Sequence, residues 1–217
     1  MIDPVITRNL VHTKNGIWKS TKNSDVSYPE DAHRHLFSVE EDSFWFRHRN
    51  NCIVTVVQRF PPREYIIDVG GGNGYVSLGL QNKGFKVIML ESGTEGVINA
   101  QKRGVEYLLH TTFQDADFPA SSVDSIGFFD VLEHIKYDHA FLTDAHRCMK
   151  SGGILYITVP AHQYLWSWRD VYNGHFRRYS IASLARLLKE SGFKVNYASY
   201  FFSGLSLPIF FSFLDKF

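Results

Sequence analysis

The sequence predicts an α/β fold with a mainly parallel sheet and helices on both of its faces. Three observations predict it. Apolar, β-branched runs alternate with helix-compatible stretches from Tyr65 onward. A loop with almost no side chains follows the first run at residues 70–74, at the strand-to-helix corner where open α/β sheets bind nucleotide-like ligands. Glycines stand where the later helices should end: Gly84, Gly104, Gly152, Gly153 and Gly192.

Each predicted element follows from its local pattern. The strands are short apolar runs, expected at 65–69, 86–91, 105–109, 123–129, 153–159 and 194–201. The helices lie between them, at 74–83, 94–102, 138–149 and 180–191. A further helical region runs from Val39 to Phe60, where Pro61 and Pro62 end it. Strands separated by helices are joined as right-handed βαβ units, so ligands should bind at the carboxyl edge of the sheet.

The two ends of the chain are patterned differently from the middle. Residues 1–37 are polar and weakly patterned, so we predict an irregular N-terminal arm followed by one domain at 38–217. The segment 203–214 is apolar but too short to span a bilayer, which takes about 20 residues. We expect it to form a core helix or a homodimer contact, with membrane-surface contact as the alternative.

The overall composition points to no nucleic-acid or membrane partner. The formal net charge is +1, so no strong basic field surrounds the protein. Two cysteines, Cys52 and Cys148, are too few for a disulfide framework. No basic region followed by an apolar run opens the sequence, so we expect no signal peptide and a cytoplasmic location.

The glycine loop narrows the choice of ligand. It reads Asp68-Val69-Gly70-Gly71-Gly72-Asn73-Gly74. Tyr75 stands where a dinucleotide fingerprint needs its third glycine, and the Lys-Ser/Thr ending of a phosphate loop is absent. Asp68 would repel a pyrophosphate, so the acidic, glycine-lined pocket favours a cationic ligand. Glu91 ends the next strand 23 residues after Asp68, close to the offset at which a carboxylate binds ribose hydroxyls.

The pattern Asp68-x-Gly70-x-Gly72-x-Gly74 resembles the first motif of class I S-adenosylmethionine (SAM)-dependent methyltransferases. The run Asp130-Val131-Leu132-Glu133-His134-Ile135 resembles the motif that follows the fourth strand in that family. Gly152-Gly153 before a strand that ends at Pro160 is similar to a further family signature. Segments 44–50 and 174–180 resemble those of bacterial members that are often associated with polysaccharide or lipid-linked sugar pathways.

The resemblance covers residues 38–202 and implies a Rossmann-like class I fold with SAM as the cofactor. Such folds usually end in an antiparallel hairpin, whose final strand we expect to be missing, displaced or outside the given sequence here. The cofactor-binding residues that it implies are Asp68, Gly70, Gly71, Gly72, Gly74, Glu91, Asp115 and Asp130. Asp115, or alternatively Asp117, is expected to meet the adenine amino group; a turn-forming aspartate is the other interpretation.

The acceptor side follows from the chemistry of methyl transfer. The reaction is an in-line displacement, so the protein aligns the nucleophile, and a histidine base would assist a hydroxyl acceptor. In the strand order that the resemblance implies, the strands that precede His134 and His175 are neighbours, so we expect the two side chains to converge on the transfer site from opposite walls of one crevice. The loop 161–179 suits a substrate lid, with a packed surface loop as the alternative. Its expected substrate-binding residues are Trp166, Arg177, Arg178 and Tyr179.

Two questions stay open at this point, and one further expectation concerns an aromatic run. The two arginines could instead pair with Asp170 or Glu133. Asp130, Glu133 and His134 would share one helix face and could hold a divalent cation, so whether a metal binds is undecided. We also expect the aromatic run 44–46 to cover the cofactor cleft and to pack on Trp166 and Trp168.

The sequence therefore predicts a SAM-dependent methyltransferase that acts on a small-molecule or lipid-linked saccharide acceptor. One alternative is an RNA methyltransferase, although the sequence shows no basic stripe. The other is a non-catalytic protein that binds SAM.

Overall fold

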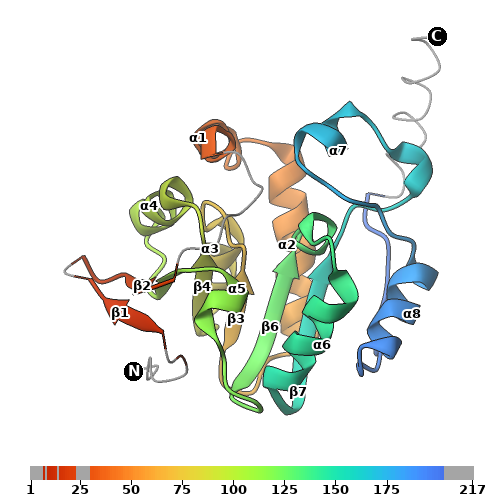
Figure 1. Cartoon of the computed structure of the whole chain (residues 1–217). Coiled ribbons are helices and arrows are strands. Elements are labelled where there is room, and N and C mark those ends of the chain that lie inside the picture. Colours follow the sequence, from red (N-terminus) through yellow and green to blue (C-terminus); the bar gives the residue numbers. More distant parts are fainter. Residues whose placement is uncertain (1–6, 8, 14, 23–29, 203–217) are drawn as a thin grey trace.

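The computed structural model describes residues 7, 9–13, 15–22 and 30–202, and it contains a seven-stranded sheet of order β1-β2-β5-β4-β3-β6-β7 (Figure 1). Among the described strands, only the pair β1 and β2 is antiparallel. The strands are β1 (Leu10–His12), β2 (Trp18–Ser20), β3 (Ile66–Val69), β4 (Val87–Glu91), β5 (Leu108–His110), β6 (Val123–Phe129) and β7 (Met149–Thr158).

Helices join these strands and cover both faces of the sheet. The α-helices are α1 (Glu30–Val39), α2 (Phe44–Arg59), α3 (Tyr75–Gln81), α4 (Thr94–Arg103), α5 (Phe113–Ala116), α6 (Asp138–Cys148), α7 (Trp168–Tyr172) and α8 (Ile181–Glu190). Two 3-10 turns, η2 (Leu132–His134) and η3 (Gln163–Leu165), lie in the loops that follow β6 and β7. The predicted α/β architecture is confirmed.

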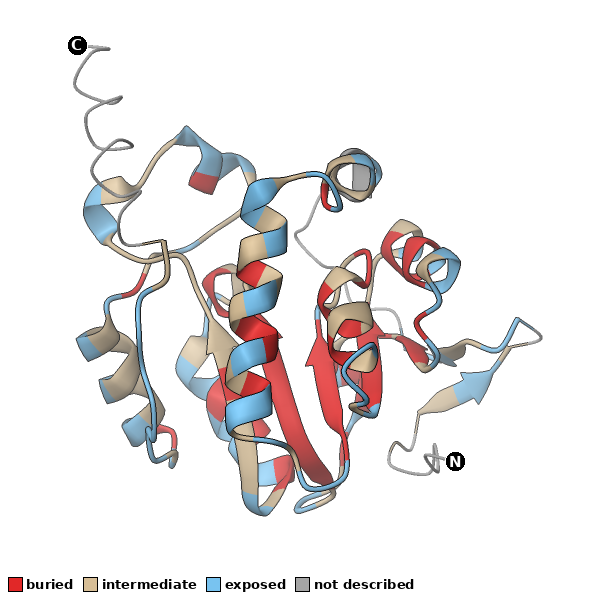
Figure 2. Cartoon of the chain, turned by 180° about the vertical axis from the view of Figure 1, so that it is seen from behind, coloured by how far each residue is buried: buried red, intermediate tan, exposed pale blue. Residues whose placement is uncertain are grey.

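The two faces of the sheet bury two different sets of side chains, because neighbouring residues of a strand point to opposite faces. Ile66 belongs to one core cluster together with Val57 of α2, whereas Ile67 belongs to a separate cluster together with Leu142 of α6. Figure 1 shows α6 in front of β6 and β7, and the view from behind in Figure 2 shows the long helix α2 over the opposite face. The central strands are red in Figure 2 because they are buried on both sides, as parallel strands in α/β sheets are.

The strand order fixes where a ligand can bind. Strand β3 lies between β4 and β6. The strands that follow β3 in sequence, β4 and β5, are added on one side of it, and the later strands β6 and β7 are added on the other side. Such a reversal opens a crevice at the carboxyl ends of the strands. Asp68, Glu91 and Asp130 stand at or just after the carboxyl ends of β3, β4 and β6.

The N-terminal arm contains regular structure, which corrects the prediction of an irregular segment. Strands β1 and β2 form a hairpin, and β2 adds to the sheet edge by pairing in parallel with β5. Trp18 also packs against the larger core cluster. Each strand has three residues, which is too short for a period of two to be recognised in the sequence.

Other differences lie at the ends of predicted elements. Strand β7 begins at Met149, four residues before the predicted start. The helix predicted from Val39 to Phe60 begins at Phe44 as α2, and α1 (Glu30–Val39) lies mostly in the arm that was predicted to be irregular. The predicted strand 194–201 is wrong, since these residues form no ladder and Val195 and Tyr197 are 39% and 47% exposed. The expected missing final strand and dimer contact concern residues 203–217, which lie outside the described part of the chain. Among the described helices, none has the length and apolarity needed to cross a membrane.

Candidate active site

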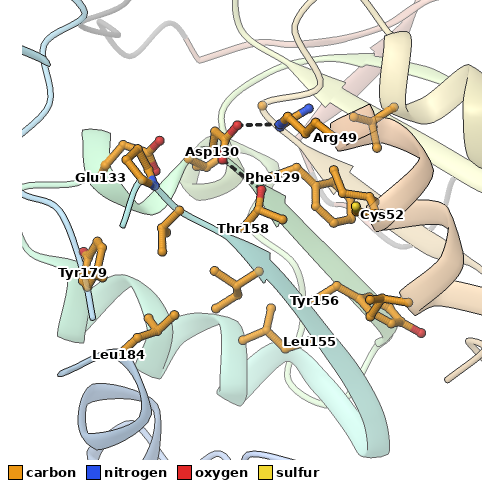
Figure 3. A pocket seen from close by; sticks show the side chains of 18 of the residues that line it. Arg49, Cys52, Phe129, Asp130, Glu133, Leu155, Tyr156, Thr158, Tyr179 and Leu184 are labelled. Atoms are coloured by element: carbon orange, nitrogen blue, oxygen red, sulfur yellow. Dashed lines mark hydrogen bonds and ion pairs between the residues drawn. The ribbon is translucent and has the colours of Figure 1, made fainter. Parts of the chain in front are cut away.

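A cavity of about 2530 Å³ opens at the carboxyl edge of the sheet, between the glycine loop, α2 and the loop that follows β7. It exceeds the roughly 300–1,000 Å³ of a single small-molecule site, because it continues along the side of β7 toward α8. Figure 3 shows part of its wall, with Arg49 on α2, Asp130 after β6 and Thr158 at the end of β7. The cavity therefore has room for a cofactor and an acceptor together.

Glycine is favoured in the loop 70–74 for its backbone conformation and, at two positions, for lack of space. Gly70, Gly72 and Gly74 have φ values of +67°, +55° and +79°, which L-residues rarely adopt. A Cβ on Gly71 would lie 2.6 Å from Cγ of Met89, and one on Gly74 would lie 2.8 Å from Cβ of Ala100. At Gly72 a Cβ would meet nothing within 4 Å, so that position faces open space beside the cavity.

Glu91 connects the glycine loop to the start of α4. Its carboxylate accepts hydrogen bonds from the backbone N–H of Gly72 at 2.8 Å and of Gly93 at 2.6 Å. The side chain is buried and lines the cavity. A carboxylate has about four acceptor positions, so Glu91 can hold the loop and still bind ligand hydroxyls.

Asp68 is buried beneath the loop and does not stand free in the cavity. Its Oδ2 accepts a hydrogen bond of 2.6 Å from the hydroxyl of Ser77 at the start of α3. Burial raises the pKa of Asp68 to about 6, and the opposing effects of Ser77 and Arg49 do not cancel this shift. Asp68 thus connects β3 to α3 through Ser77, and it also forms part of the cavity wall.

Asp130 is held in a strained position from two sides. Its φ is +60°, an uncommon value for a residue other than glycine and one that often marks a functional site. Nε of Arg49 donates to its Oδ2 at 2.6 Å, and the hydroxyl of Thr158 donates to its Oδ1 at 2.9 Å (Figure 3). Sequence reasoning missed Thr158, whose position at the end of the strand beside β6 was the available signal.

Asp115 lies away from this cavity. It is buried in the short helix α5, where its backbone N–H donates to Oγ1 of Thr112 at 3.0 Å. It does not occur among the described residues that line the cavity, and neither does Asp117. An adenine contact by Asp115 therefore stays a prediction.

The imidazoles of His134 and His175 converge as expected. Their ring centroids are 4.7 Å apart with the planes nearly perpendicular, and both rings line the same cavity as Gly70–Gly72. Burial, and next the neighbouring His175, lower the pKa of His134 to about 4. His134 is therefore neutral at physiological pH but a weak proton acceptor.

Glu133 precedes His134 in the same 3-10 turn. Burial, followed by the charge of Asp130, raises the pKa of Glu133 well above its usual range. We call Glu133, His134 and His175 the histidine wall.

The two candidate substrate arginines are engaged inside the protein. Arg178 makes a fork of hydrogen bonds to Asp170 at 2.7 and 2.9 Å, which confirms the alternative pairing. Burial works against the charge of Asp170, but its hydrogen bonds from Arg178, Ser167 and His175 prevail and lower its pKa to about 2. Arg177 is paired with Asp138 rather than with Glu133.

The other predicted lid residues differ in their positions. Tyr179 is buried and lines the cavity, and its hydroxyl donates to Asp138 at 2.9 Å. Trp166 and Arg177 do not occur among the described lining residues, whereas Trp168 does and is 70% exposed. The loop between Ala161 and Tyr179 includes η3 and α7 and is closed by a bridge between those two residues.

The aromatic run at the start of α2 has a different partner from the predicted one. Trp45 stacks on Phe202 with ring centroids 4.0 Å apart, whereas the sequence predicted contacts with Trp166 and Trp168. Phe44 is 65% exposed and meets the edge of the same Phe202 ring. Trp45 and Phe46 still line the cavity, so part of the run covers the cleft as expected.

Comparisons with known proteins identify the family of this chain. A family model described as "Methyltransferase domain" matches residues 45–198. A Mycolicibacterium smegmatis protein named a probable S-adenosylmethionine-dependent methyltransferase is 25% identical over 182 residues, 82% of this chain and 70% of that protein. A Mycobacterium tuberculosis protein with the same description is 25% identical over 167 residues, which cover 74% of this chain and 59% of the relative.

Solved structures show the same fold. A Haloferax volcanii methyltransferase, determined in a complex with the Trm112 methyltransferase activator, superposes with a TM-score of 0.64. It is 20% identical to this chain, and the match covers 80% of each chain. The family match extends over most of the chain and includes the glycine loop, Glu91 and the histidine wall. The chain therefore belongs to the methyltransferase-domain family, and it is a SAM-dependent methyltransferase.

Proposed function

We propose that this methyltransferase transfers the methyl group of SAM to a hydroxyl oxygen of a small-molecule or lipid-linked saccharide acceptor. The observation that carries the proposal is the position of the histidine wall, which lines the same cavity as the glycine loop. A methyl group presented from above Gly70–Gly72 would point along the cavity toward the two imidazoles. His134 and His175 would then orient the acceptor hydroxyl.

On the cofactor side, each polar group has a separate task. Glu91 binds the ribose hydroxyls of SAM, since its carboxylate lines the cavity and retains free acceptor positions. Asp130 faces the cationic methionine end, and its ion pair with Arg49 fixes the direction of its carboxylate. The backbone of Gly70–Gly72 lies against the cofactor, because no Cβ stands in the way.

The reaction needs alignment more than proton chemistry. A lone pair of the acceptor oxygen forms the new bond to the methyl carbon, while the carbon–sulfur bond breaks and its electrons stay on sulfur. The products are the methyl ether and S-adenosylhomocysteine, and the hydroxyl proton passes to a base or to water. Holding the two reactants in line can lower the barrier by about 7–11 kcal/mol.

The mouth of the cavity supports a neutral, ring-shaped or lipid-linked acceptor. Trp168 and Tyr172 line the cavity and are 70% and 66% exposed, so their rings are available to a ligand. Aromatic rings offer a flat apolar surface with a polar edge, which suits sugar rings and lipid linkers. Arg178 is bound to Asp170, so an anionic acceptor has less support here.

A labelling experiment tests the proposal. The purified chain is incubated with methyl-labelled SAM and an extract of the source organism, and the extract is then separated into lipid, small-molecule, protein and nucleic-acid fractions. We expect base-stable label in the lipid or the small-molecule fraction, above that of the extract alone, and at least tenfold less of it when a Glu91→Ala variant replaces the wild type at a SAM concentration that does not saturate the variant. Label confined to the nucleic-acid or protein fraction would contradict the proposal.

A further inference from the structure

Three potential metal ligands lie together in the histidine wall. One donor atom each of Glu133, His134 and His175 lies within 4.8 Å of the others. Three ligands of one tetrahedral ion, each about 2.1 Å from it, are about 3.4 Å apart. Movements of less than about 1 Å, well within side-chain rotation, would thus bring all three onto one ion. A set of two imidazoles and one carboxylate suits borderline transition metals better than Mg²⁺ or Ca²⁺, which prefer oxygen ligands alone.

Glu133 is the second and independent observation. Its side chain is buried, and its Oε2 has no hydrogen-bond partner among the described residues. Two arginines that line the same cavity are engaged elsewhere, Arg178 with Asp170 and Arg49 with Asp130. A buried carboxylate oxygen is normally hydrogen-bonded, paired with a charge or bound to a metal. A cation in the wall would give this oxygen the partner that the protein does not supply.

Both imidazoles are already oriented by groups behind them. Nδ1 of His175 lies 3.0 Å from Oδ1 of Asp170, so Nε2 is the ring nitrogen left for a ligand. Asp170 is itself fixed by the fork of Arg178. His134 is hydrogen-bonded to the backbone of Asn173. Metal-binding histidines usually have such carboxylate or backbone partners, which set the tautomer and the direction of the ring.

We propose that Glu133, His134 and His175 bind one divalent first-row transition-metal ion, such as Zn²⁺ or Mn²⁺, with its open coordination positions facing the cavity. The ion would neutralise the buried carboxylate and lie at the wall where the acceptor is expected. If the acceptor is a hydroxyl, as proposed above, coordination would lower the pKa of that hydroxyl and replace a protein base. This catalytic role rests on the proposed function, whereas the metal site does not.

Direct binding to the full chain tests the site without any acceptor. The protein is stripped with a chelator, and Zn²⁺, Mn²⁺ and Mg²⁺ are titrated calorimetrically, with metal content measured after dialysis. We expect one Zn²⁺ or Mn²⁺ per chain, and at least tenfold weaker binding in Glu133→Gln and in His175→Ala. His139→Ala is the matched control, since His139 is exposed on α6 away from the cavity. Its affinity should equal that of the wild type.

A spectroscopic measurement on the wild type covers the case in which a variant does not fold. Co²⁺ bound by two imidazoles and a carboxylate should give visible absorption that saturates at one equivalent and is displaced by Zn²⁺. The proposal is overturned if neither Zn²⁺ nor Mn²⁺ binds at one equivalent, or if folded Glu133→Gln and His175→Ala bind as tightly as the wild type. A failure to find a hydroxyl acceptor would leave these results unchanged, so the two proposals can fail separately.

Discussion

The two halves of the cavity are built in different ways. On the cofactor side, the shape comes from the backbone: positive φ values at Gly70 and Gly72, and N–H groups that donate to Glu91. On the acceptor side, it comes from a side-chain network in which Arg178, Asp170 and His175 support one another across the loop after β7. The first half depends on residues that are close in sequence, and the second on charges brought together by the fold.

This difference predicts that substitutions in the two halves impair different properties of the protein. A substitution on the acceptor side should lower turnover or stability and leave SAM binding intact, because no backbone of the glycine loop changes. A substitution on the cofactor side should weaken SAM binding first. The predictions below test that separation, from the largest expected effect to the smallest.

The largest effect is expected on turnover. His175→Ala should lower the turnover number about 10²–10⁴-fold, whether the ring orients the acceptor directly or through a metal ion. The affinity for SAM should stay within about twofold, because His175 belongs to the lid and not to the glycine loop. Single-turnover assays with saturating SAM measure the first quantity, and calorimetry measures the second. Equal losses of both would show that the two halves do not act separately.

Loss of Asp170 should cost the most stability. Asp170→Ala leaves Arg178 without its carboxylate partner in a site where only 18% of the arginine side chain is exposed. Breaking such a buried pair costs about 3–5 kcal/mol of unfolding free energy, to be measured by urea denaturation. The control is Asp144→Ala, whose partner Arg147 is 45% exposed, and it should cost about 0–1 kcal/mol. Similar losses in both variants would contradict the structural role given to Asp170.

The glycine loop should be sensitive to a single methyl group. At Gly74 a Cβ would meet Ala100 at 2.8 Å, whereas at Gly84, which also has positive φ, it would meet nothing within 4 Å. The φ values of the two glycines are similar, +79° and +85°, so the difference between the two alanine variants reports mainly the clash. We expect Gly74→Ala to be less stable than Gly84→Ala by about 1–3 kcal/mol. Equal midpoints in thermal unfolding would show that the loop adapts.

The pH dependence of stability should separate Asp68 from Asp170. The pKa of Asp68 is raised to about 6 in the folded protein. Its contribution to the free energy of unfolding is therefore complete below about pH 4 and is lost as the pH rises through 6. Asp170, with a pKa of about 2, stays ionised throughout that range. Between pH 4.5 and 6.5 the wild type should therefore lose about 1–2 kcal/mol more unfolding free energy than Asp68→Asn does. An unchanged profile would place Asp68 in a more polar site.

The sequence allowed the cofactor side to be predicted better than the acceptor side. The glycine loop and Glu91 were recognisable because strand, turn and helix are consecutive, and local backbone demands select the residues. The convergence of His134 and His175 was predicted from the strand order that the family resemblance implies, in which β6 and β7 are neighbours. The ion pair of Arg49 with Asp130 joins residues 81 positions apart, and nothing local in the sequence specifies it.

The errors have the same physical origin. Arg177 and Arg178 resembled ligand-binding side chains, because a free arginine and one with an internal partner look alike in a sequence. Strand 194–201 had the right residue types but found no ladder partner, and the three-residue strands β1 and β2 were too short to recognise. In each case, the outcome depended on a distant segment.

The central claim is that the glycine loop and Glu91 bind SAM independently of the histidine wall. Calorimetric titration of SAM into the wild type, Glu91→Ala and His175→Ala tests it most directly. We expect Glu91→Ala to weaken SAM binding by about 1.5–3 kcal/mol, roughly ten- to a hundredfold, because a charged hydrogen bond is lost. His175→Ala should bind like the wild type, and NAD should bind more weakly than SAM. Unchanged SAM affinity in Glu91→Ala, or tighter binding of NAD than of SAM, would contradict the account.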